Sequence, residues 1–63
     1  MSEPVDRVAV RQMMRGLDGF ARSLGLDEGA TRTIVEKVIA DMPEHLHDER
    51  MMEARKRMLL ASA

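Results

Sequence analysis

The densest set of side chains able to do chemistry is residues 44–49, with the sequence Glu-His-Leu-His-Asp-Glu. Imidazole and carboxylate groups are metal ligands, and a nearby thioether can join them. On a helix, side chains two residues apart point about 200° away from each other, so His45 and His47 cannot share an ion. Only His47 with Met51, or His45 with Glu49, has the spacing of a joint site, and two ligands hold a metal weakly. We therefore expect no metal and no other cofactor.

Nucleophilic catalysis has few candidate residues. The sequence contains no cysteine and no tyrosine, and its serines, Ser2, Ser23 and Ser62, lie at predicted ends or at a turn, without a histidine at a predictable range. It has no glycine-rich phosphate-binding loop. We expect the protein not to be an enzyme and to have no small-molecule substrate.

The composition limits how these residues can be positioned. The chain has 63 residues, seven methionines and a single aromatic residue, Phe20. A chain of this length buries only about 60% of the surface that its unfolded form exposes, so we expect one domain, residues 1–63, with little stability to spare. Without cysteine it has neither disulfides nor thiolate zinc sites. Association with another chain is the remaining way to stabilise it.

Charge and hydropathy indicate where the protein works. Ten basic and eleven acidic side chains give a net charge of −1, which predicts no strong attraction to phosphate backbones or anionic lipid. The first six residues, 1–6, are acidic where a signal peptide would be basic, and no apolar run approaches the length of a membrane span. We expect a soluble cytoplasmic protein that does not bind membranes.

Apolar residues recur at intervals of three and four, which predicts three helices, over approximately 4–24, 27–42 and 44–61. For the first helix we expect Ser2 as N-cap and Pro4 in the first turn. Pro43 should end the second helix and, with Glu44, open the third.

Glycine and aspartate mark the first turn and one helix contact. Gly25 is expected to close the first helix in a left-handed conformation, and Asp27 to cap the second. Gly16 borders the apolar face of the first helix, where it would let another helix approach closely. Gly19 lies on the polar side, where a local kink or break could form.

Each predicted helix has one apolar face, with Val8 the one apolar residue out of place on the first. The three faces comprise Val5, Ala9, Val10, Met13, Met14, Leu17, Phe20, Ala21 and Leu24; Thr31, Ile34, Val35, Val38, Ile39 and Met42; and His47, Met51, Ala54, Met58 and Ala61. Met52 and Leu59 widen the third face on one flank. Short connections favour antiparallel neighbours. The prediction is an all-α fold completed by oligomerisation: either a small three-helix bundle, or a helical hairpin that dimerises and lays its third helix across the partner.

Methionine is flexible and polarizable, so a chain too small to bury seven of them is expected to use some at an interface. The functional hypothesis is a protein–protein interaction module that acts as a regulator, adaptor or antagonist. It would bind a second copy of itself, as a homodimer, and another protein that the sequence does not identify. The expected contact residues are His47, Met51, Met52, Ala54, Met58 and Leu59.

An alternative starts from residues 21–27, Ala-Arg-Ser-Leu-Gly-Leu-Asp, which resemble the Ala-x-x-x-Gly-Leu-polar core of helix-turn-helix DNA-binding motifs. The resemblance covers residues 20–38, and Thr31 departs from it where the motif has Val or Ile. It implies a DNA-binding transcriptional regulator. The implied DNA contacts are Arg22, Arg32, Thr33 and Lys37. Nearby glutamates make this face almost neutral, which disfavours the DNA-binding alternative.

Overall fold

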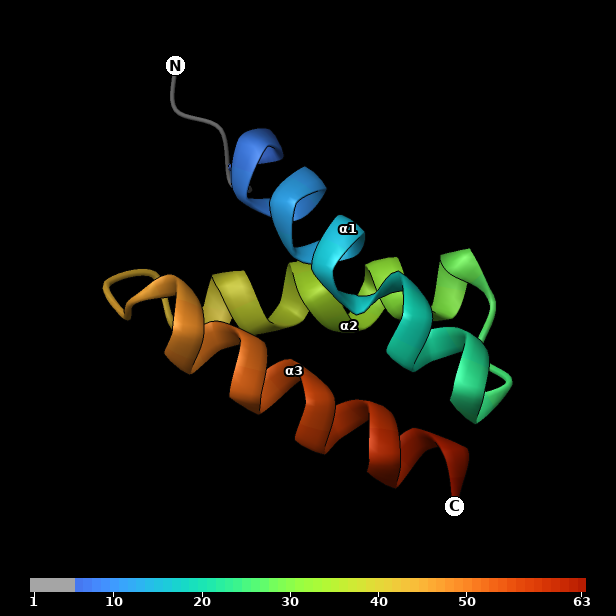
Figure 1. Cartoon of the computed structure of the whole chain (residues 1–63). Helices are drawn as coiled ribbons and strands as arrows, with labels where there is room; N and C mark the ends of the chain where they lie inside the picture. Colours follow the sequence, from blue (N-terminus) through green and yellow to red (C-terminus); the bar gives the residue numbers. More distant parts are fainter. Residues whose placement is uncertain (1–5) are drawn as a thin grey trace.

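Three α-helices make up the part of the chain that the computed structural model describes, residues 6–63 (Figure 1). They are α1 (Arg7–Leu24), α2 (Glu28–Asp41) and α3 (His47–Ser62), and no strand occurs within these residues. Each helix packs against both of the others. The predicted all-α class is therefore confirmed, and of the two predicted arrangements the chain adopts the three-helix bundle.

The helix α1 begins later than predicted. Asp6 has an extended backbone, and its Oδ1 accepts hydrogen bonds from the backbone N–H of Val8 at 3.0 Å and of Ala9 at 3.3 Å. Because this carboxylate satisfies two N–H groups that have no partner inside the helix, Asp6 is the N-cap and the helix starts at Arg7 rather than at residue 4. The cap and first turn predicted from Ser2 and Pro4 lie outside the described residues.

The turn between α1 and α2 forms as predicted. Gly25 has a φ of 75°, which is the left-handed region that glycine adopts without steric cost. The N–H of Leu26 donates to the carbonyl of Ala21 at 3.0 Å, and that of Gly25 donates to Arg22 at 3.1 Å, which together form a Schellman motif. Asp27 then caps α2 by accepting from the N–H of Ala30 at 2.7 Å.

The connection between α2 and α3 is longer than predicted, because residues 42–46 are not helical. Pro43 ends α2 as expected but does not start α3, so the predicted start at residue 44 is wrong. The start is fixed instead by Glu49, whose carboxylate accepts a hydrogen bond from the N–H of Leu46 at 3.0 Å. Leucine has no side-chain acceptor, so this bond is only half of a capping box. It makes Leu46 the N-cap and His47 the first helical residue.

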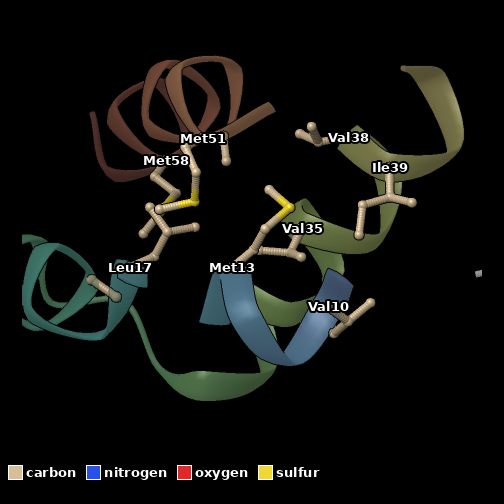
Figure 2. Packing of buried hydrophobic residues seen from close by; sticks show 10 residues of the cluster. Val10, Met13, Leu17, Val35, Val38, Ile39, Met51 and Met58 are labelled. Atoms are coloured by element: carbon tan, nitrogen blue, oxygen red, sulfur yellow. The ribbon is translucent and has the colours of Figure 1, made fainter. Parts of the chain in front are cut away.

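The core lies between the three helices and contains aliphatic and thioether side chains but no aromatic ring (Figure 2). Met51 and Met58 of α3 point toward Leu17 of α1 in this view. Phe20 is only partly buried, at the edge of the cluster. The fully buried or nearly buried apolar residues are Val10, Met13, Leu17, Ala21, Val35, Val38, Ile39, Met51, Ala54 and Met58.

The predicted apolar faces of α1 and α2 are confirmed for the residues that the structure describes; Val5, predicted on the α1 face, lies outside them. The central residues of both faces are buried, and Val8 is exposed, as its position on the polar side required. On α3, the middle of the predicted face is buried, whereas His47 and Ala61 at its two ends are exposed. The buried part of α3 is therefore shorter than its sequence pattern.

Gly16 allows α3 to approach α1 closely, as predicted. A Cβ atom at Gly16 would lie 2.8 Å from the Cε methyl of Met51, which is closer than two carbon atoms pack. Gly19 has no atom within 4 Å of the same position, and α1 runs through it without a break. The two glycines of α1 therefore differ: a side chain at Gly16 would displace the end of Met51, whereas one at Gly19 would meet no other atom.

Alanine substitutions should separate these two roles. Gly19→Ala should stabilise the protein by about 0.5–1 kcal/mol, because alanine costs less backbone entropy than glycine in a helix. Gly16→Ala should stabilise the protein less, because the new methyl group displaces the terminal methyl group of Met51. Gly25→Ala should destabilise, because alanine is strained at a φ of 75°. Urea unfolding followed by circular dichroism measures all three, and an equal gain for Gly16→Ala and Gly19→Ala would contradict the close approach.

Arg57 joins the end of α2 to the middle of α3. Its Nη1 lies 3.0 Å from Oδ2 of Asp41, the last residue of α2, and its Nε donates to Oε2 of Glu53 at 2.8 Å. The hydrogen bond from Arg57 holds the pKa of Glu53 below its ordinary value of 4.5. The carboxylate of Glu53 must therefore be ionised for this ion pair to stabilise the folded chain.

The stability contributed by Glu53 should depend on pH. Because its folded pKa lies below 4.5, its contribution is fully present above that value and is lost as the pH falls through the folded pKa. Glu53→Gln should lower the urea midpoint at neutral pH, and its difference from the unmodified protein should shrink at acidic pH. Glu36→Gln is the control, since Glu36 is exposed and forms no ion pair within residues 6–63. A difference that does not vary with pH would contradict the assignment.

Candidate interaction surfaces

The contact residues predicted on α3 fall on two different sides of the helix. Met51, Ala54 and Met58 lie in the core of the chain itself, where they pack against α1 and α2 and have almost no exposed surface. Met52 and Leu59, by contrast, are 68% and 52% exposed. His47, the first residue of α3, is exposed as well. The binding of a partner by α3 therefore stays a prediction, and the residues with surface to offer are His47, Met52 and Leu59.

We call Met52, Leu59 and Leu60 the outer stripe of α3. Met52 and Leu59 are seven residues apart, so they lie two turns apart on the same side of the helix. Leu60, 69% exposed, adjoins them on the solvent side. The stripe thus presents three large apolar side chains on the side of α3 that does not face the core. Single exposed apolar residues are ordinary, but several on one helix face are typical of binding surfaces.

The residues implied in DNA binding are all exposed, although most already have a partner. Arg22 pairs with Asp18 at 3.3 Å, and Arg32 pairs with Glu28 at 3.0 Å. The hydroxyl of Thr33 donates to the carbonyl of Gly29 at 3.0 Å. Lys37 shares the exposed side of α2 and has no ion pair in the described part of the chain. Few charges on this side of the molecule are therefore free to meet phosphate.

A groove of about 620 Å³ lies between α1 and the first turn of α2, and sequence reasoning did not identify it. Its apolar surface comes from residues that also contact the core. The lining residues are Arg11, Met14, Arg15, Asp18, Ala21, Arg22, Leu26, Glu28 and Thr31. The spacing of the arginines beside Met14 and Ala21 was visible in the sequence. The groove itself depends on how α2 packs against α1, which the sequence does not show.

The unpaired charge in this groove is positive. Asp18 pairs with Arg22, and Glu28 pairs with Arg32, so both acidic residues of the lining are neutralised. Arg11 and Arg15 have no ion pair anywhere in residues 6–63. They are four residues apart and therefore lie one turn apart on the same ridge of α1. Each guanidinium has a fork of N–H donors that matches a carboxylate.

The histidines do not form a cluster that resembles a metal site. His45 lies in the connection before α3 rather than on the helix, so the helical spacing from His45 to Glu49 that the sequence suggested is not present. His47 is exposed, whereas Met51 is buried in the core. Within the described residues, no three histidine, cysteine, aspartate or glutamate side chains gather closely enough to hold an ion.

Comparisons with known proteins give no independent assignment. No protein-family model matches the sequence, and searches of curated proteins and of solved structures find no significant match. Among residues 6–63, no helix is both long and apolar enough to cross a membrane.

Proposed function

We propose that the protein is a small cytoplasmic protein–protein interaction module that forms a homodimer and holds a further protein as a regulator, adaptor or antagonist, without enzymatic activity. The observation that supports this proposal is the outer stripe of α3. Its three side chains are more than half exposed, although the opposite side of the same helix is already fully used in the core.

The physical reason is the apolar surface that remains in water. Burying a Leu or Met side chain completely gains roughly 1.5–3 kcal/mol, so burying the stripe on both copies supplies a substantial part of an association energy. Two copies of α3 packed side by side, or α3 laid into a partner's groove, would bury the stripe.

A DNA-binding regulator remains the second candidate. Its support is the turn between α1 and α2, where the left-handed Gly25 and the capping Asp27 occupy the glycine and polar positions of the motif that the sequence resembles. The exposed side of α2 also presents Arg32 and Lys37. The ion pairs of Arg22 and Arg32 weaken it, because a phosphate would have to compete with a carboxylate already in place.

Self-association should depend on the outer stripe. At about 500 mM salt, where contacts between exposed charges are screened, the double variant Met52→Lys and Leu59→Lys should shift the mass measured by sedimentation equilibrium from dimer to monomer. It should keep the helical circular dichroism spectrum, because both side chains are exposed. Val8→Lys is the matched control, since Val8 is also an exposed apolar residue but lies on α1. It should leave the mass unchanged.

Met58 is next to Leu59 in the sequence but lies in the core, so we expect a different outcome for its substitution. Met58→Lys should unfold the chain at every concentration, because it places a charge at a site that is 0% exposed.

An unmodified protein that stays a folded monomer at high micromolar concentration would overturn the proposed dimer. An unchanged mass for the double variant would overturn the assigned surface.

The DNA-binding candidate is tested by titrating the protein against random duplex DNA at several salt concentrations. Phosphate contacts would make the affinity fall steeply with salt. If Lys37 touches a phosphate, Lys37→Ala should reduce the slope of log affinity against log salt concentration by about one. No binding at low salt would exclude this candidate.

A further inference from the structure

The connection between α2 and α3 presents an exposed apolar side chain in an acidic stretch of sequence. Leu46 is 72% exposed and lies between the exposed His45 and His47, and the carboxylates of Glu44, Asp48 and Glu49 lie just beyond them in the sequence and are exposed as well. Nothing in the described chain covers Leu46. We call residues 44–49 the acidic loop, although its last three residues form the first turn of α3.

This loop is held in place by hydrogen bonds. Arg50 donates from Nε to the carbonyl of Met42 at 2.9 Å and from Nη2 to that of Pro43 at 2.7 Å. At the other end, Glu49 accepts from the N–H of Leu46. A segment fixed in this way loses little conformational freedom on binding, so the loop is preorganised as a ligand.

The acidic loop and the groove between α1 and α2 have complementary properties. The groove carries the unpaired Arg11 and Arg15 beside the apolar surface of Met14 and Leu26. The loop carries carboxylates beside one apolar side chain. A groove of about 620 Å³ has room for a leucine side chain and the backbone that bears it. Each surface thus lacks what the other presents.

The two surfaces cannot meet within one chain. Figure 1 shows the turn before α2 at one end of that helix and the acidic loop at the other. The groove includes Glu28, the first residue of α2, whereas the loop follows Asp41, its last. A helix of 14 residues separates them by about 21 Å. Any contact between them must therefore join two molecules.

We propose that the acidic loop of one copy docks into the groove between α1 and α2 of a second copy, with Leu46 on the apolar surface and the carboxylates of Glu44 and Asp48 on Arg11 and Arg15. The contact adds a second interface to the proposed self-association, and it uses different residues from the outer stripe. Because it joins two unlike surfaces, it is heterologous: one copy keeps a free groove and the other a free loop. Repetition builds a ring or an open chain, and exposed charges make it sensitive to salt.

The test uses pairs of variants in a protein that already carries Met52→Lys and Leu59→Lys, which removes the outer stripe. At low salt this parent should still associate, and the association should weaken as salt is raised from about 50 to about 500 mM. The groove variant adds Arg11→Glu and Arg15→Glu. The loop variant adds Glu44→Lys and Leu46→Ser, where serine keeps a suitable N-cap. Each alone should associate roughly tenfold or more weakly than the parent.

Mixing the two variants gives the decisive result. The loop variant still has an intact groove and the groove variant an intact loop, so an equimolar mixture should form a heterodimer and nothing larger in sedimentation velocity. Arg55→Glu with Lys56→Glu is the matched control, since it makes the same change of charge on α3, outside the groove, and should associate like the parent. Circular dichroism checks that every variant is folded.

Several outcomes would overturn the contact. They are a folded parent that is monomeric at low salt, a groove or loop variant that associates like the parent, and a mixture that contains only monomers. The first of these leaves the proposed dimer through the outer stripe intact, because that dimer is measured in the protein without the two lysines. A loss of the outer-stripe dimer, in turn, leaves the heterologous contact open to its own test. The two proposals therefore fail separately.

Discussion

Met51 of α3 places its terminal methyl group where a side chain at Gly16 of α1 would begin. Beside this contact α3 packs against both α1 and α2, and Met58, two turns further along, is completely buried. The rest of the structure depends on side-chain packing of this kind, because the chain has no disulfide or large aromatic core to hold three short helices together. The flexible thioether side chains adapt to the irregular space between the helices. Branched side chains would fill that space only if their shapes matched it more closely.

The sequence pattern was sufficient where one local signal dominates. The spacing of Val10 and Leu17 predicted the buried face of α1, and Gly25 followed by Asp27 predicted both ends of the first turn, because a left-handed glycine and a capping carboxylate act within a few residues. It was insufficient where several signals compete. Pro4 and Pro43 both suggested helix starts. The described start of α1 is set instead by the Asp6 carboxylate, and that of α3 by the carboxylate of Glu49.

Tertiary packing decided what the pattern left open. The face predicted on α3 was wide enough to include Met52 and Leu59, and the sequence could not say which part of it would meet α1 and α2. The groove beside Arg11 and Arg15 was equally hidden, because its depth depends on where the first turn of α2 lies. The arginines were visible in the sequence, but only the structure shows which of them lack a carboxylate partner.

Met58 and Leu59 are adjacent in the sequence, yet one has no exposed surface and the other is 52% exposed. From composition alone, stability and binding would be expected to share one surface, since a chain of this size hides its apolar residues with difficulty. In the structure, the buried residues that stabilise the fold differ from the exposed residues that we propose for binding. The core is complete within one chain, and Met58 is part of it. Leu59 and Leu46 are not needed for the fold and are therefore available for association. A surface that the fold does not need can bind weakly and reversibly, which suits a regulator better than an obligate assembly.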